Sequence, residues 1–316
     1  MRYLVTGGAG FIGSNTVDEL VRRGHGVVVL DDLSSGKEEN LGEARGKITF
    51  IKGSIIDLEI VQKATLQADY VIHLAARTSV PRSVKDPIDT NRINVDGTLN
   101  VLVAARDNKV KRVVFAASSS AYGDTPTLPK LETMQPVPIS PYGVTKYVGE
   151  LYAQTFGRCY GLENVCLRYF NIFGPRQDPV SPYSGVLSRF AAAFLESTPP
   201  VIFGDGGQTR DFTYVDNAVQ ANILACEAQG ASGRTFNVGT GQSVSLNQVL
   251  GMLQKIAGKT LTANYEAPRE GDIRDSLADI ELARDVLGYE PSVQFADGLE
   301  RTFAWYQTQY AKKVTT

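Results

Sequence analysis

The sequence comprises 316 residues, of which 43% are hydrophobic, so it can bury a sizeable core in one large or two modest domains. Its 32 Lys and Arg residues nearly balance 34 Asp and Glu residues, which leaves a formal net charge of −2. This balance excludes the strongly basic surface that binds the phosphate backbone of nucleic acids. No apolar run reaches the length of about 18 residues that crosses a membrane, so we expect no transmembrane helix.

Cysteines and histidines are few and scattered. Cys159, Cys166 and Cys226 form no C-x-x-C motif, which argues against a disulfide framework and a zinc site. We interpret His25, which lies between two glycines, as a solvated turn residue, and His73 as a packing residue that hydrogen-bonds beneath a loop. We therefore expect an enzyme without metal. Because the first strand runs directly into a glycine cluster, we also expect no signal peptide and a cytoplasmic location.

In the first half of the chain, short β-branched runs alternate with segments long enough for helices, such as residues 91–108. Near-continuous apolar strands in this alternation indicate βαβ units and a parallel sheet that is covered on both faces. The expected strands are residues 3–6, 27–30, 48–52, 70–74, 113–117 and 165–169.

Beyond about residue 175 the pattern changes, because proline and glycine cluster at residues 175–185, 198–207 and 267–271. We interpret this part as a second, smaller α/β domain. Residues 1–175 and a returning segment at about 211–240 would form the first domain, and residues 176–210 and 241–316 the second. The expected elements of the second half are helices at residues 186–196, 216–227, 245–257, 279–287 and 297–309, and a strand at 236–238.

The strongest local motif is Thr-Gly-Gly-Ala-Gly-Phe-Ile-Gly at residues 6–13, directly after the first expected strand. Gly8, Gly10 and Gly13 fit G-x-G-x-x-G, and Gly7 gives the alternative spacing G-x-x-G-x-x-G. Glycines here permit a tight turn, let backbone approach a pyrophosphate and allow close contact between helix and strand. The strand, turn and helix around the motif predict a doubly wound Rossmann sheet that binds a dinucleotide.

Asp31 and Asp32 follow the second expected strand at the distance of the ribose-binding carboxylate. Either carboxylate would accept hydrogen bonds from the adenosine ribose and repel a 2′-phosphate. The pair therefore favours NAD over NADP.

Tyr142 and Lys146 lie four residues apart at the start of an expected helix, with Ser140 as its N-cap and Pro141 at its first position. Residues at this spacing project from nearly the same face. A nearby ammonium lowers the pKa of a phenol by about 1–3, which would make Tyr142 a base that can take a proton from a sugar hydroxyl. The pattern alone also occurs on ordinary helices.

Ser118, Ser119 and Ser120 follow the fifth expected strand. Ligands of open α/β sheets bind outside the carboxyl ends of the strands, so these hydroxyls could bond a reacting oxygen there. A serine-rich turn is the alternative. The order of glycine turn, acidic pair, serine cluster and Tyr-x-x-x-Lys is more specific than any one part.

With these motifs the chain resembles the extended short-chain dehydrogenase/reductase superfamily, and within it the UDP-hexose 4-epimerases, closest to the UDP-N-acetylglucosamine 4-epimerases. The family's Arg-Tyr-Phe-Asn corresponds to residues 168–171, and its serine before Tyr-Gly corresponds to Ser118. The resemblance implies that NAD stays bound and that a 4-keto sugar forms, turns and is reduced on its other face. It assigns Ser118, Tyr142 and Lys146 as catalytic residues.

The resemblance further implies two sets of binding residues and no metal. One departure concerns the adenine, because the family's Gly-Asp-Ile or Gly-Asp-Leu is here Gly53-Ser54-Ile55, so either Ser54 or Asp57 could replace the aspartate. The implied NAD-binding residues are Gly7, Gly10, Phe11, Ile12, Gly13, Asp31, Asp32, Ser54, Ile55, Leu74, Ala75, Ala76, Asn94, Tyr142, Lys146 and Tyr169. The implied UDP-sugar-binding residues are Ser79, Ser118, Ser119, Ser120, Tyr142, Asn171, Arg210, Arg269, Asp272 and Ser276.

Ser276 bears on which sugar fits. In the family a tyrosine at this position restricts the enzyme to glucose and galactose, whereas a small residue leaves space for an N-acetyl group. Serine therefore predicts UDP-GlcNAc and UDP-GalNAc as substrates, with UDP-glucose and UDP-galactose also accepted.

Other functions remain open. A 4,6-dehydratase would need an Asp-Glu pair where this chain has Ser119, Ser120 and Ala121. A UDP-glucuronate 4-epimerase, another NAD-dependent nucleotide-sugar enzyme and a non-catalytic NAD sensor are the further alternatives. The family often forms dimers, and a homodimer here could use residues 91–108 and 142–160.

Overall fold

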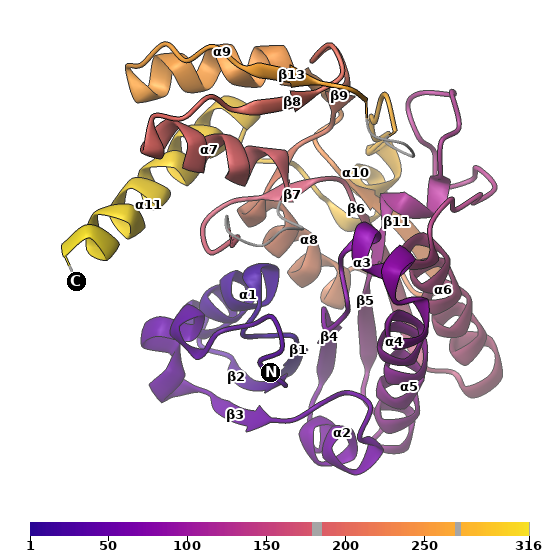
Figure 1. The fold of residues 1–316 in the computed structure, drawn as a ribbon. Helices are drawn as coiled ribbons and strands as arrows, with labels where there is room; N and C mark the ends of the chain where they lie inside the picture. Colours follow the sequence, from indigo (N-terminus) through magenta and orange to yellow (C-terminus); the bar gives the residue numbers. More distant parts are fainter. Residues whose placement is uncertain (179–184, 269–272, 316) are drawn as a thin grey trace.

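The computed structural model describes residues 1–178, 185–268 and 273–315. At its centre lies a seven-stranded sheet of order β11-β6-β5-β4-β1-β2-β3, in which every neighbouring pair is parallel (Figure 1). This confirms the predicted doubly wound Rossmann sheet. The strands are β1 (Arg2–Thr6), β2 (Gly26–Asp31), β3 (Thr49–Lys52), β4 (Tyr70–His73), β5 (Arg112–Ser118), β6 (Glu163–Tyr169) and β11 (Arg234–Val238).

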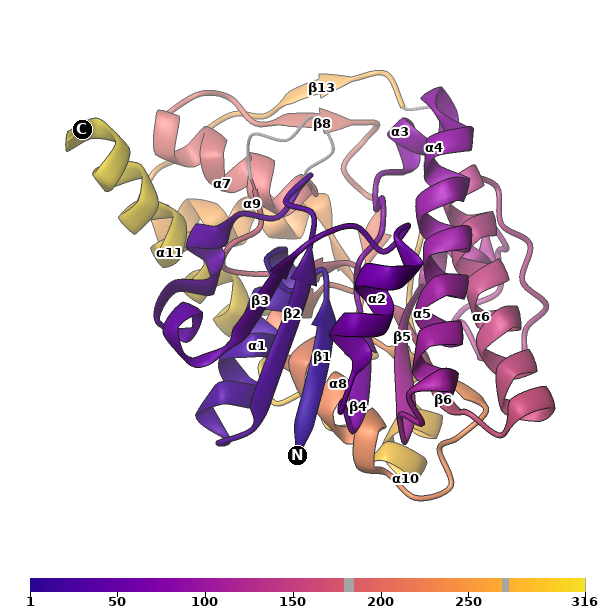
Figure 2. The same cartoon turned by 90° about the horizontal axis from the view of Figure 1, so that it is seen from below.

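Each face of the sheet is covered by helices, which explains why the strands are apolar along their whole length. Val5 packs in the core on one face, and its neighbour Leu4 packs in the core on the other, because successive side chains of a strand point in opposite directions. On the first face lie α1 (Phe11–Arg22) and α8 (Val215–Glu227). On the second lie α2 (Leu58–Thr65), α5 (Gly97–Asp107) and α6 (Pro141–Tyr160) (Figure 2).

The helix expected at residues 91–108 starts earlier and contains an irregular turn. α4 (Pro87–Asn91), the π-helical turn η2 (Arg92–Asp96) and α5 follow one another without a break. Pro87 lies in the first turn, and the carboxylate of Asp86 accepts a hydrogen bond from the Asp89 amide at 3.1 Å. This cap sets the start of the helix four residues before the expected one.

The second half of the chain lies over the carboxyl ends of the strands (Figure 2). Among the described residues, β7 (Ile172–Phe173) pairs with β10 (Thr213–Tyr214), β8 (Val201–Phe203) with β13 (Asn264–Glu266), and β9 (Thr209–Arg210) with β12 (Val244–Ser245). Around them lie α7 (Val186–Glu196), α9 (Leu246–Ala257) and α11 (Phe295–Thr315), whereas α10 (Glu281–Leu287) packs against β11 and α8. β11, in contrast, belongs to the main sheet, and α8 covers one of its faces. The division into two domains stays a prediction.

Short helical segments complete the first half: η1 (Glu38–Lys47), α3 (Val80–Lys85) and η3 (Ser119–Tyr122). The prediction that His25 is a solvated turn residue is wrong. Its ring is half-buried and packs on the ring of Tyr3, with the centroids 5.0 Å apart. The turn before β2 folds back onto β1, and this contact cannot be read from the two flanking glycines.

Candidate active site

The glycine-rich turn between β1 and α1 forms a cradle that side chains would fill. Gly7 has φ +69°, and a Cβ atom there would lie 2.7 Å from the Ala75 amide nitrogen. A Cβ atom on Gly13 would lie 2.1 Å from the Gly7 carbonyl oxygen. The N-cap of α1 is Gly10, which has no side chain to occupy the first amides of the helix. These amides and the positive end of the helix dipole can hold an anion such as a pyrophosphate.

Asp31 and Asp32 at the end of β2 have different surroundings. Asp31 is buried and accepts hydrogen bonds from the Ala9 amide at 2.9 Å and the Leu33 amide at 2.8 Å, so it holds the glycine turn in place. Asp32 is exposed and accepts one from the Ser34 amide at 2.9 Å. Each Asp31 oxygen has a second lone pair, so both carboxylates can accept further hydrogen bonds.

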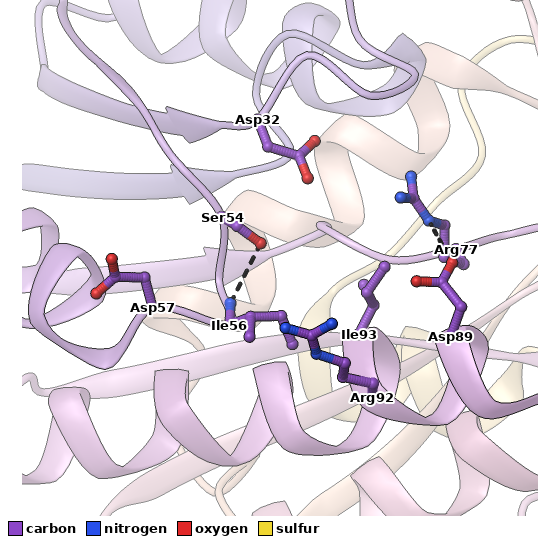
Figure 3. A pocket seen from close by; sticks show the side chains of 8 residues that line it. All are labelled: Asp32, Ser54, Ile56, Asp57, Arg77, Asp89, Arg92 and Ile93. Carbon is purple, nitrogen blue, oxygen red and sulfur yellow. Dashed lines mark hydrogen bonds and ion pairs between the residues drawn. The ribbon is translucent and has the colours of Figure 1, made fainter.

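Asp32 also lines a cavity of about 430 Å³ beyond the ends of β2, β3 and β4 (Figure 3). On the opposite wall, Arg77 pairs with Asp89 at 3.3 Å and donates to the Ser34 hydroxyl at 2.6 Å. The size suits one half of a dinucleotide. The cavity is lined by Asp32, Ser54, Ile56, Asp57, Arg77, Asp89, Arg92 and Ile93.

The segment after β3 enters this cavity with residues only partly expected. Ser54 lines it, and its hydroxyl accepts a hydrogen bond from the Ile56 amide at 3.3 Å. Asp57 lines it too, with one carboxylate oxygen used to cap α2 at the Ile60 amide. The Ile55 side chain is buried against Gly97 instead, and Ile56 takes its place in the cavity. Ile56, Arg77 and Arg92 were not expected here, because their only signal in the sequence is a position after a strand or in a helix turn.

The loop after β4 lies against the glycine turn. The Leu74 amide donates to the Thr6 carbonyl at 3.1 Å, and the Ala75 amide donates to the Thr6 hydroxyl at 3.3 Å. Ala76 follows at the same edge. Asn94, in the π-helical turn, is buried and holds the loop by accepting from the Arg77 amide at 2.7 Å and donating to its carbonyl at 3.1 Å.

His73, at the end of β4, is 1% exposed and joins β1 to α5, which confirms the packing and hydrogen-bonding expected of it. The Thr98 hydroxyl donates to the Asn94 carbonyl at 2.6 Å, so it accepts from the histidine Nε2–H at 3.0 Å. Nδ1 then accepts from the Thr6 hydroxyl at 2.7 Å. Burial, and secondarily the Lys146 charge, lowers the pKa of His73 to about 3, so the ring is neutral.

Ser118 and Tyr142 meet at the carboxyl end of β5. Ser118 is the last residue of that strand, and its hydroxyl oxygen accepts from the Ser120 amide at 3.2 Å and hydroxyl at 2.9 Å. Tyr142 lies in the first turn of α6, which the Ser140 side chain caps at the Gly143 amide, 3.1 Å away. The Ser118 hydroxyl lies close enough to the Tyr142 phenol to oppose the rise of its pKa on burial. Since the Ser118 oxygen already accepts two bonds, its own proton is free for the phenol oxygen.

Lys146 lies one turn further along α6 and is buried. Its ammonium donates to the Ala116 carbonyl at 2.8 Å and lies 5.0 Å from the centre of the Phe115 ring. We expected this charge to lower the pKa of the phenol. Instead, burial raises the pKa of Tyr142 to about 12, opposed by the Ser118 hydrogen bond, and burial lowers the pKa of Lys146 to about 8. The spacing of four residues shows that Tyr142 and Lys146 share a helix face, but it does not show how far each side chain is removed from water.

The residues expected to bind the UDP-sugar come together around β9. Asn171, with φ +37°, donates to the Asp211 carbonyl at 3.1 Å, and Arg210 donates to the Thr209 carbonyl at 2.8 Å. Ser276 is half-buried beside them, and its amide donates to the Thr209 carbonyl at 3.2 Å.

A buried carboxylate orders this region. Asp211 accepts from the Thr240 amide at 2.8 Å, the Gly241 amide at 3.0 Å and the Ala278 amide at 3.2 Å. It therefore ties together three segments that are distant in sequence. Arg210 directly precedes Asp211, and Ser276 lies two residues before Ala278. The hydrogen bonds of Asp211 therefore fix the backbone at both residues.

The other expected residues lie at the rim or outside the described chain. Ser79 caps α3 by accepting from the Arg82 amide at 3.1 Å, and Ser119 and Ser120 form the first turn of η3. Tyr169 lies beside Ser118 in the β5–β6 register, but its hydroxyl bonds to Asn222 on α8. Phe11 and Ile12 are half-buried at the start of α1. Arg269 and Asp272 lie outside the described residues.

Within the described ranges, no helix combines the length and apolarity needed to cross a membrane. The same residues contain no group of three or more His, Cys, Asp and Glu side chains that could hold a metal ion.

A family model, the NAD dependent epimerase/dehydratase family, matches residues 3–239. The chain belongs to this family. The match confirms the predicted superfamily and NAD as its cofactor, and the relatives below confirm an epimerase, an isomerase, as the enzyme class.

Three solved structures are similar along the whole chain. The UDP-glucose 4-epimerase of Thermotoga maritima with UDP-glucose is 41% identical, with a TM-score of 0.94 over 98% of this chain and 100% of that one. The UDP-N-acetylglucosamine 4-epimerase of Methanobrevibacter ruminantium in complex with UDP-N-acetylmuramic acid is 41% identical, with a TM-score of 0.94 over 98% of each chain. The UDP-glucose 4-epimerase of Thermus thermophilus in complex with NAD is 37% identical, with a TM-score of 0.89 over 97% and 99%.

The buried neutral His73 predicts a specific acid sensitivity. Its pKa is about 3 in the fold against an ordinary 6.5, so its contribution to stability is complete above pH 6.5 and is lost as the pH falls toward 3. Between pH 7 and pH 5 this loss is about 2 kcal/mol. His73→Asn should lack it, so its free energy of unfolding should fall less steeply over this range in urea denaturation. Equal slopes for the two proteins would contradict the prediction.

Proposed function

We propose that this protein is an NAD-dependent 4-epimerase of UDP-hexoses. The observation that carries the proposal is the meeting of Ser118, Tyr142 and Lys146 at the carboxyl end of β5, beside the glycine cradle of β1. Membership of the family and similarity to UDP-sugar 4-epimerases support it. NAD, when bound, supplies the hydride acceptor and a positively charged ring.

The cradle and the adjoining cavity fit this cofactor. The pyrophosphate would lie at the N-terminus of α1, and the adenosine would extend toward Asp32 and Ser54. The implied positions at Asn94 and Tyr169 would act through the loops they hold, since their side-chain groups are bonded within the protein. Ser54 and Asp57 both line the cavity, and we propose that one of the two meets the adenine amine.

In the proposed reaction, Tyr142 removes the proton from the sugar 4-hydroxyl while hydride leaves C4. Ser118 donates to the phenol oxygen or to the reacting oxygen. Burial raises the pKa of Tyr142 to about 12, so the phenolate needs positive charge close by, and Lys146 is the cation on its own helix face. The 4-keto sugar then turns about its diphosphate link and is reduced on the other face.

The diphosphate must stay fixed during this turn. We propose Asn171, Arg210 and Arg269 as its anchors, with guanidinium groups suited to binding phosphate oxygens at two points, and Asp272 as a residue that binds the uridine ribose. Ser79, Ser119 and Ser120 would face the hexose. The cytoplasmic location stays a prediction.

Product analysis tests the proposed activity. The purified protein is incubated separately with UDP-GlcNAc, UDP-glucose and UDP-glucuronate, and the C4 epimers are quantified. We expect turnover of UDP-GlcNAc, and Tyr142→Phe should reduce it about 100- to 10,000-fold while NAD remains bound, because only the proton transfer is lost. NAD binding without epimerisation of any substrate would favour the sensor, and turnover of UDP-glucuronate alone would favour that alternative.

The choice of sugar is proposed to depend on Ser276. A serine leaves space beside β9 for an N-acetyl group in either orientation of the hexose, which favours UDP-GlcNAc and UDP-GalNAc. Ser276→Tyr should reduce kcat/KM for the acetylated substrate by about 10- to 100-fold through overpacking and spare UDP-glucose. Equal loss for both sugars would reject this role of the pocket.

We also propose that the protein is a homodimer that uses α5 and α6. Val144 and Leu151, seven residues apart on α6, are exposed, and so are Val84 and Ile88 on the neighbouring α3 and α4. Light scattering should give twice the 34.3 kDa of one chain, and Val144→Glu with Leu151→Glu should give one chain. A monomeric native protein would refute the dimer.

A further inference from the structure

A buried ion pair lies directly behind the candidate catalytic residues. Arg168 on β6 binds Glu150 on α6 in a fork, with Nε to Oε1 at 2.9 Å and Nη2 to Oε2 at 2.8 Å. The side chains are 4% and 1% exposed. Such a pair costs desolvation energy and is weak evidence of a stabilising role. None of the chemistry proposed above uses it.

Its place on α6 continues the row of candidate catalytic residues. Tyr142, Lys146 and Glu150 follow one another at spacings of four, so they lie along one helix face. Arg168 pairs in register with Ala117, next to Ala116, whose carbonyl accepts the Lys146 ammonium at 2.8 Å. One anion and two cations therefore lie together in the interior.

Glu150 is the carboxylate that binds Arg168 directly, and the half-buried Glu132 is a second acidic group near the guanidinium. The Arg168 Nη1 has no hydrogen-bond partner within the described residues, and the guanidinium lies over the ring of Tyr122, 4.6 Å from the centroid. The Tyr122 hydroxyl bonds to Asn237 at 2.6 Å. If Glu150 were neutral, two cations would lie together out of water, with Glu132 as the remaining acidic group near Arg168.

The other titratable groups around Lys146 are uncharged. From β4 comes His73, whose pKa burial lowers to about 3, and from η3 comes Tyr122, whose pKa burial raises to about 12. Burial also raises the pKa of Cys166 on β6. The charged side chains of α3, α4, η2 and α5, which pack on other parts of α6, lie at exposed or half-exposed positions. Lys146, Glu150 and Arg168 thus carry a net charge of +1, the opposite of a phenolate at Tyr142.

We propose that Glu150 is a positioning residue for Lys146: its carboxylate neutralises Arg168, so that the Lys146 ammonium keeps its proton in the interior and faces Tyr142 as net positive charge. This role rests on the proposed function. It explains why an ion pair lies one helical turn behind the lysine. The pKa of Lys146 agrees with this role: burial lowers it to about 8, and the Glu150 charge opposes that lowering.

The test measures the charge of Lys146 directly. The protein is labelled with lysine carrying 13C at Cε, the Lys146 signal is assigned by its loss in Lys146→Arg, and its midpoint of titration is followed by NMR. In Glu150→Gln the midpoint should move about one to two pH units lower, because an attraction is lost and Arg168 is left unpaired. In Glu150→Gln with Arg168→Met, part of this shift should be recovered, because the second cation is gone.

A matched control exists on the same two strands. Arg112 and Glu163 form a pair at 2.6 Å between the first residues of β5 and β6, at the opposite end from the site. Glu163→Gln should leave the Lys146 midpoint unchanged. The double variant guards against misfolding of Glu150→Gln, since apolar replacement of a whole buried ion pair is often tolerated.

The outcomes separate this proposal from the proposed function. A folded Glu150→Gln in which Lys146 titrates as in the native protein overturns the positioning role, and so does a double variant whose Lys146 midpoint lies as low as that of Glu150→Gln, whatever the enzyme turns over. A shift in the expected directions supports it even if no UDP-sugar is epimerised. If the enzyme does epimerise, kcat of Glu150→Gln should fall about two- to tenfold near neutral pH, with KM nearly unchanged, because that is the loss of protonated Lys146 that the shift produces.

Discussion

The withdrawal of one polar face of α6 from water is the constraint on which the candidate site depends. A phenol and an ammonium that are buried together each lose solvation, and both pKa values move toward the uncharged forms. The surroundings limit this loss, because the Ala116 carbonyl accepts from the ammonium and Ser118 bonds the phenol. The pKa of Lys146, at about 8, leaves it mostly protonated at neutral pH. The site is therefore poised between a neutral and a charged arrangement, which is useful for moving a proton.

The parallel sheet makes this arrangement possible because all its strands end at one edge. The glycine turn follows β1, the carboxylates follow β2, the Asn94-held loop follows β4 and Ser118 ends β5. Backbone contacts join these loops, from the Ala75 amide at Thr6 to the Ala9 amide at Asp31. Each loop therefore holds its neighbour. The segments over this edge are tied together in turn by Asp211, so the residues proposed to bind the UDP-sugar are held in place relative to the same loops.

The buried titratable groups behind the candidate site are neutral or paired with an opposite charge, apart from Lys146. His73 is kept neutral by burial and by the Lys146 charge, and two threonine hydroxyls determine its tautomer. Arg168 and Glu150 cancel each other, and Lys146 remains as the cation beside Tyr142. Protonation of another buried group in this interior is unfavourable, because the added positive charge would lie out of water close to an existing cation.

The sequence by itself determined the strands of the main sheet, the glycine cradle and the row of Tyr142 and Lys146. These features depend on local periodicity and on turn geometries that favour glycine. It also indicated Ser140 as a helix cap, since capping acts over three residues. The tertiary structure alone decided the rest. It set the pKa values of Tyr142 and Lys146, placed Ile56 rather than Ile55 in the cavity, turned Asn94 inward through a π-helical turn, and joined Glu150 to Arg168. These features depend on water excluded and contacts made by segments distant in the chain, and no local pattern carries that information.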